Sequence, residues 1–144
     1  MNGGAKIISV EFSLDVQATA EKLWDILADV ESWPLWQGTH FVKTSEPGQI
    51  KEGSNFTAEI GGLRWAFKVT KAEKPYKIVW NAQCLGLKVV HGWEFNETAG
   101  KTTVITYETM TGWMLSLTYP IFKIALPYVV KNFLADLKVR AENI

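Results

Sequence analysis

Apolar and polar residues alternate regularly near the start of the chain. From Ile8 to Val16 every second residue is apolar, which is the period of a strand with one buried face. Thr19 can then cap a short helix, whose apolar residues recur at helical spacing. These residues are Ala20, Leu23, Trp24, Leu27 and Val30. Pro34 disfavours helical geometry at Trp33, so a break or a second short helix is predicted there.

Turn signals then divide the chain into short runs rich in β-branched and aromatic residues. Among them are Pro47-Gly48, Gly61-Gly62, Lys74-Pro75 and Ala99-Gly100. The runs predict strands over residues 39–45, 54–60, 63–72, 78–83, 87–95 and 102–111. Their connections are short, as in antiparallel hairpins. With the first strand, the pattern predicts a seven-stranded antiparallel sheet.

The last part of the chain predicts a long helix. The segment that begins at Met114 and ends at Val130 is strongly apolar, but Lys123 lies within it and it is shorter than the roughly 20 residues of a membrane span. Residues at helical spacing form one face: Phe122, Leu126, Val129, Phe133 and Leu137. Pro120 is expected in the first turn, and Pro127 is expected to kink the helix or to mark its real start. The exposed part of this segment is a candidate for transient membrane contact.

This order of elements predicts an α+β fold in which a curved antiparallel sheet grips the C-terminal helix. At 144 residues and 16.2 kDa the chain fits a single domain over residues 1–144. Hydrophobic residues make up 47% and charged residues 21%, which argues against disorder and against a fibrous repeat. Seven Trp and seven Phe supply unusually large apolar area, for a bulky core or for the wall of a ligand pocket.

Strand periodicity turns an aromatic-rich face of the sheet toward the helix. Trp65, Phe67, Trp80 and Trp93 share this face, which also carries His91. A strongly bent sheet and one long helix tend to leave a volume between them, so we predict a ligand cavity there. Its predicted lining is Trp65, Phe67, Trp80, His91, Trp93, Thr106, Phe122, Leu126, Val129 and Phe133.

His91 is the polar exception on the inward face. Such a histidine is most often a satisfied wall residue, and the alternatives are ligand hydrogen bonding and acid/base catalysis. If Phe95 pairs with Thr102, His91 lies opposite Thr106, and Glu108 lies diagonally from His91 on the same face. A slip of one residue turns Glu108 to solvent instead, so the sequence leaves both orientations open.

Charge and motif content exclude several classes of function. Fifteen basic and fifteen acidic residues cancel, so no net field attracts nucleic acid. Cys84 is the only cysteine and the two histidines lack paired-ligand spacing, so neither a disulfide nor a metal site is expected. The chain has no glycine-rich nucleotide motif and no hydrolase signature, and no cofactor is expected. The absence of a signal-peptide pattern and the lone Cys84 predict a cytoplasmic protein.

Three segments resemble a known family. The stretch SVEFSLDVQATAEKLWDILADVESWPLW is similar to the opening strand and helix of the START-like or Bet v 1-like superfamily, also called SRPBCC. HGWEFNETAGKTTVITYE resembles its penultimate hairpin, and FLADLKVRAEN resembles the end of its final helix. The resemblance is to the bacterial polyketide cyclase/dehydrase and lipid-transport branch and covers nearly the whole chain. It implies a helix-grip fold with a deep apolar cavity, used for lipids, polyketides, sterols, quinones or hormones.

Three functions follow from these observations. The leading prediction is a non-catalytic binder or carrier of a small hydrophobic molecule, with His91 orienting a polar group of the ligand. The alternative is an enzyme of cyclase or dehydratase type, in which His91, together with Glu108, moves a proton next to a carbonyl. A third alternative is a protein-interaction module, which requires a filled core and a functional exterior.

Overall fold

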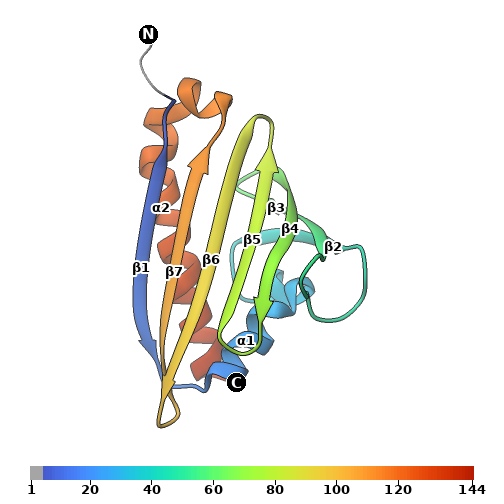
Figure 1. Ribbon diagram of the computed structural model, residues 1–144, viewed down its shortest axis with the longest axis vertical. Coiled ribbons are helices and arrows are strands. Elements are labelled where there is room, and N and C mark those ends of the chain that lie inside the picture. The colour runs from blue at the N-terminus through green and yellow to red at the C-terminus, as the bar shows by residue number, and fades with distance from the viewer. Residues whose placement is uncertain (1–4) are drawn as a thin grey trace.

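The computed structural model describes residues 5–144 and has two layers, a curved sheet and a long helix that crosses one face of it (Figure 1). The sheet has seven antiparallel strands in the order β1-β7-β6-β5-β4-β3-β2. This is the helix-grip architecture that the sequence predicted. The elements in chain order are β1 (Ile8–Val16), α1 (Ala20–Ala28), the 3₁₀ helix η1 (Val30–Leu35), β2 (Thr39–Thr44), β3 (Asn55–Ile60), β4 (Leu63–Glu73), β5 (Lys77–Cys84), β6 (Leu87–Thr98), β7 (Lys101–Thr111) and α2 (Trp113–Glu142).

The two short helices cover the end of the sheet at which α2 finishes. The Thr19 side chain caps α1 by accepting a hydrogen bond of 3.1 Å from the backbone N–H of Lys22. Pro34 lies inside η1, the second short helix. Trp33 is fully buried, and its indole Nε1 donates to the carbonyl of Leu27 at 3.0 Å. The break before Pro34 therefore anchors a large ring between the helices and the sheet.

Helix α2 begins earlier than the proline positions predicted. Pro120 and Pro127 both lie inside it, so the expectation that one of them marks the helix start is wrong. A proline removes one backbone donor and leaves the carbonyl four residues earlier without its helical partner. Those carbonyls belong to Ser116 and Lys123, which are both exposed, so water can replace the lost bonds. Exposure of this half of the helix explains why two prolines are tolerated.

The hairpin of β6 and β7 pairs in a different register from the predicted one. Phe95 lies opposite Val104, whereas Thr102 lies opposite Glu97. Both strands extend to a two-residue turn at Ala99-Gly100. Residues 96–98 are polar, so the sequence pattern predicts a loop there, but they pair with β7 and continue the sheet. The correction is two residues, an even number, so the faces are preserved. Glu108 therefore points inward and lies directly opposite His91.

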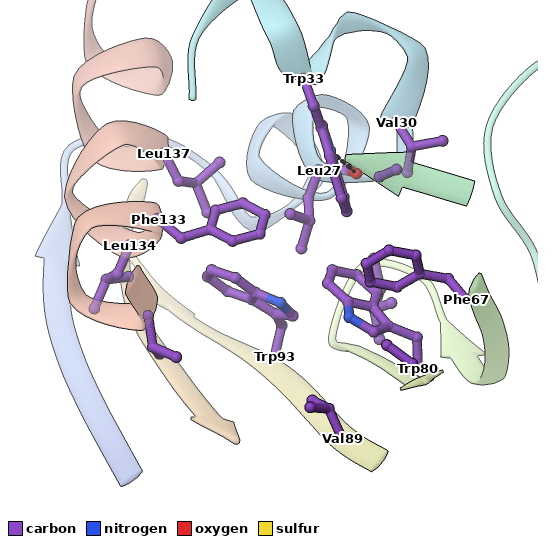
Figure 2. Packing of buried hydrophobic residues seen from close by; sticks show 14 of the residues in the cluster. Leu27, Val30, Trp33, Phe67, Trp80, Val89, Trp93, Phe133, Leu134 and Leu137 are labelled. Atoms are coloured by element: carbon purple, nitrogen blue, oxygen red, sulfur yellow. Dashed lines mark hydrogen bonds between the residues drawn. The ribbon is translucent and has the colours of Figure 1, made fainter. Parts of the chain in front are cut away.

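Aromatic rings fill one half of the space between sheet and helix. The ring of Trp33 lies 5.5 Å from that of Phe56, 5.4 Å from that of Trp80 and 5.2 Å from that of Phe133, measured between centroids. Figure 2 shows Trp33 reaching from the helical side toward Phe67 and Trp80, with Phe133 of α2 above Trp93. We call this part of the interior the closed half. Such ring pairs, in mostly edge-to-face orientations, hold the two layers together.

Candidate ligand-binding cavity

The other half of the interior contains a cavity of about 420 Å³ between the sheet and the middle of α2. Sheet residues form its floor and α2 forms the facing wall, with Gly61 and its neighbours in the β3–β4 turn at the rim. The lining residues are Trp33, Ile60, Gly61, Leu63, Trp65, Phe67, Trp80, Ala82, Val89, His91, Glu108, Met110, Ile121, Phe122, Ala125, Leu126, Val129, Val130 and Phe133. Nearly all are apolar, as in sites for small organic ligands.

The structure brings most of the predicted lining together. Trp65, Phe67, Trp80, His91, Phe122, Leu126, Val129 and Phe133 all line the cavity. Trp93 and Thr106 do not, which corrects the prediction for these two residues. The ring of Trp93 is covered by Phe133 at 5.0 Å and stacks on His91 at 5.0 Å, so it belongs to the closed half. Thr106 is fully buried and is hydrogen-bonded to His91, which does line the cavity.

Strand alternation missed several wall residues for identifiable reasons. Trp33 comes from a 3₁₀ turn, which has no strand period to reveal its direction. Ile121 and Ala125 lie beside the predicted apolar face of α2, since the cavity is wide enough to touch more than one face of that helix. Met110 and Val89 do lie on the predicted inward faces, and their pairing across the β6–β7 hairpin could have identified them.

His91 and Glu108 form a buried polar pair in the cavity wall. Nδ1 of His91 lies 3.2 Å from Oε1 of Glu108, and both residues are at most 8% exposed. Nε2 of His91 lies 2.7 Å from Oγ1 of Thr106. Adjacent strands β6 and β7 hold these three side chains, so the geometry follows from the sheet register.

Thr106 determines which histidine nitrogen carries a proton. Its hydroxyl donates to the carbonyl of Gly92 at 3.0 Å, so the hydroxyl oxygen must accept from Nε2–H of His91. Nδ1 of His91 and Oε1 of Glu108, 3.2 Å apart, can hold one further proton between them. Two arrangements satisfy this bond: an imidazolium beside a carboxylate, or a neutral imidazole beside a carboxylic acid. In both arrangements these protons are engaged with Thr106 or within the pair, so the second carboxyl oxygen of Glu108 is the atom that can accept from a polar group in the cavity.

The backbone at Gly92 is held from the outer face of the sheet. Gly92 pairs with Tyr107, and a Cβ atom at position 92 would lie 2.1 Å from the Tyr107 ring. Only a residue without a side chain permits this close approach. The ring of Tyr107 thereby packs directly on the strand whose carbonyl orients Thr106.

Other chemistries lack support in the described part of the chain. Within residues 5–144, no group of three or more His, Cys, Asp or Glu side chains is placed to hold a metal ion. Cys84 is buried, and burial raises the pKa of its thiol, which keeps it protonated and unreactive. A second depression of about 500 Å³ lies between α1 and the end of α2. It is open and lined by charged residues such as Asp25 and Arg140, which do not suit an apolar ligand.

Comparisons with known proteins agree with this geometry. Residues 8–142 match the family model described as "Polyketide cyclase / dehydrase and lipid transport". No curated protein matches the sequence. Among solved structures, a hypothetical protein of Helicobacter pylori superposes with a TM-score of 0.79 at 16% identity, covering 95% of this chain and 88% of that one.

Two further neighbours share the fold. A START superfamily protein of Mycobacterium smegmatis has a TM-score of 0.75 at 18% identity, covering 93% of this chain and 97% of that one. The di-domain ARO/CYC BexL from the BE-7585A biosynthetic pathway has a TM-score of 0.73 at 15% identity, with coverage of 96% and 51%. This chain thus spans about half of BexL. At these identities the neighbours establish the fold alone.

Proposed function

The chain belongs to the polyketide cyclase / dehydrase and lipid transport family, and from this premise we propose that it binds a small, largely apolar molecule in the cavity, with the His91–Glu108 pair contacting the ligand's polar group. One observation carries the proposal: an apolar cavity of about 420 Å³ has a buried, hydrogen-bonded acid/base pair in its wall. Its volume falls in the range of known small-molecule sites, roughly 300–1,000 Å³.

Burial of apolar ligand surface supplies the driving force. About 200–300 Å² of buried ligand area at about 25 cal/mol per Å² is worth roughly 5–7 kcal/mol before association costs are subtracted. The polar pair adds selectivity. A ligand that covers the pair without a matching polar group removes its water without replacing the hydrogen bonds, which weakens the binding free energy. A hydroxyl at one end of an apolar skeleton matches this wall, because it can donate to the carboxyl group of Glu108.

Binding is tested with an uncharged fluorescent probe, N-phenyl-1-naphthylamine, and with native mass spectrometry of the gently purified protein. We expect saturable probe binding and a co-purified ligand. Ala125→Phe places a ring in the cavity and is expected to weaken probe binding at least tenfold. Val139→Phe is the matched control, because Val139 is exposed on the same helix outside the cavity. Equal probe binding in both variants, or no binding by the wild type, contradicts the proposal.

A cyclase or dehydratase activity is the second candidate, favoured by the buried contact between His91 and Glu108 in the cavity wall. In a dehydration, a β-hydroxy ketone loses its α-proton to a base and its β-hydroxyl as water after protonation by an acid. A His–Glu pair at the cavity wall can supply and take up such a proton. The assay follows enone absorbance with 4-hydroxy-4-phenylbutan-2-one as the probe. Wild-type turnover that is unchanged in His91→Ala removes this candidate while leaving ligand binding untouched.

A further inference from the structure

The first half of α2 carries a continuous apolar face that is exposed to solvent. Its residues follow one another at spacings of four, four, three and four: Trp113, Leu117, Ile121, Ile124 and Tyr128. All of them are exposed, and Leu117 is 73% exposed. The face runs for about 22 Å along the helix, at 1.5 Å per residue. We call it the α2 outer face.

This exposure is unusual for so apolar a helix. Among the described residues, α2 is the one helix long and apolar enough to cross a membrane, yet only 17% of its most apolar window is buried. Soluble proteins rarely expose apolar patches of this extent unless a partner covers them. The C-terminal half of the same helix packs on the sheet through Phe133, Leu134 and Leu137. The helix therefore cannot span a bilayer while the domain stays folded.

A second apolar group extends the α2 outer face. The turn between β5 and β6 consists of Leu85 and Gly86, with φ angles of 47° and 83°. Such turns favour Asn or Asp at the first position, because a bulky residue with positive φ is strained. Leu85 is nonetheless 73% exposed. The ring of Trp113 packs against Gly86, where an added Cβ would lie 2.5 Å from it. A strained, exposed leucine thus adjoins the start of the apolar face, at the same end of the molecule (Figure 1).

The charges around this face are positive and unpaired. From residue 109 to residue 135 the sequence contains no Asp or Glu, but it contains Lys123 and Lys131. Lys131 continues the line of the α2 outer face one turn beyond Tyr128. Lys123 and Lys6 both lie over the ring of Tyr119, at 5.9 Å and 5.0 Å from its centroid. Within residues 5–144, none of Lys6, Lys123 and Lys131 is within ion-pair distance of a carboxylate.

We propose that the α2 outer face, with Leu85, docks on an anionic lipid bilayer. Aliphatic residues between aromatic ends, flanked by lysines, are the features of helices that lie in a membrane interface. A second copy of the chain fits this surface less well, since a two-fold contact would bring the unpaired lysines of one copy near those of the other. Docking also places the cavity at the bilayer surface, because Ile121 belongs both to the docking face and to the cavity wall.

Co-sedimentation with vesicles tests the docking. We expect the wild type to bind vesicles of mixed phosphatidylcholine and phosphatidylglycerol, and to bind pure phosphatidylcholine more weakly. Ile124→Glu and Leu117→Glu are expected to reduce binding at least tenfold. Lys123→Gln is expected to reduce it about fivefold at low salt and less at high salt. Val139→Glu is the matched control, since Val139 is 61% exposed on the far half of the same helix and is expected to leave binding unchanged.

A spectroscopic measurement locates the contact. Trp113 is 67% exposed, so brominated phosphatidylcholine in the vesicles is expected to quench wild-type fluorescence but to quench Trp113→Phe much less. The idea fails if the wild type does not bind anionic vesicles, or if Val139→Glu weakens binding as much as Ile124→Glu does. It also fails if the wild type is a dimer that Ile124→Glu dissociates without any vesicle binding. Probe binding in the cavity is measured separately, so either proposal can fail alone.

Discussion

Both halves of α2 carry many apolar residues, but these residues pack differently in the two halves. In the C-terminal half, Val130, Phe133, Leu134, Leu137 and Ala141 are buried against the sheet and the short helices. In the N-terminal half only Leu115 and Leu126 are buried, and the other apolar residues are either partly buried beside the core or exposed. An apolar helix thus marks an interface without showing what the interface is for: the C-terminal half of α2 mainly stabilises the domain, whereas the N-terminal half leaves much of its apolar surface exposed.

The largest expected contrast is between two leucines of this helix. Leu137→Ala removes a fully buried side chain, so we expect the free energy of unfolding to fall by about 2–5 kcal/mol. Leu117→Ala changes an exposed side chain and is expected to stay within about 0.5 kcal/mol of the wild type. Urea denaturation of both variants provides the measurement. Similar losses in the two variants would mean that the N-terminal half is also packed.

A smaller effect is expected in the sheet wall of the cavity, where His91 of β6 and Glu108 of β7 meet. Glu108→Ala leaves Nδ1 of His91 buried without its partner, and we expect it to destabilise the domain by about 1–3 kcal/mol. The double variant His91→Leu with Glu108→Met replaces both groups with apolar ones, and we expect it to be about as stable as the wild type. Denaturation curves distinguish the two cases. A double variant less stable than Glu108→Ala would make the pair a structural element rather than part of a binding wall.

The smallest effect concerns Asp136, a half-buried carboxylate in the C-terminal half of α2. Partial burial raises the pKa of Asp136, so the folded state disfavours its charged form. Asp136→Asn is therefore expected to stabilise the domain by a few tenths of a kcal/mol at pH 7. This gain is expected to shrink as the pH falls toward and below the unfolded pKa of 3.8, where Asp136 is protonated in both states. A gain that persists at pH 3 in thermal melts would have another cause.

The sequence predicted those parts of the molecule that a local period encodes. Strand alternation placed all seven strands and the inward face of Trp65, Phe67 and Trp80, because each strand has one dry side. The register of the last hairpin was wrong by two residues, since Asn96 and Glu97 are polar yet continue the ladder. The sequence left both the face and the partner of Glu108 open, because a slip of one residue in the register would have turned this side chain to solvent.

The helix and its cavity were harder to predict from local signals. Proline rules assume a helix surrounded by packing, whereas the carbonyls freed by Pro120 and Pro127 belong to exposed residues. Burial of Leu137 and exposure of Leu117 depend on where the sheet curves away from α2, which is a property of the whole fold. The contribution of Trp33 to the cavity likewise depends on the position of η1.

The contact between Gly92 and Tyr107 gives a residue on the convex exterior a share in interior chemistry. The ring of Tyr107 lies against the backbone of Gly92. The carbonyl of Gly92 orients the hydroxyl of Thr106, and this hydroxyl in turn orients the imidazole of His91. Orientation of the acid/base pair is thus transmitted through the thickness of the sheet. A substitution of Tyr107, on the outer face of the sheet, is therefore expected to disturb the orientation of His91 in the cavity wall.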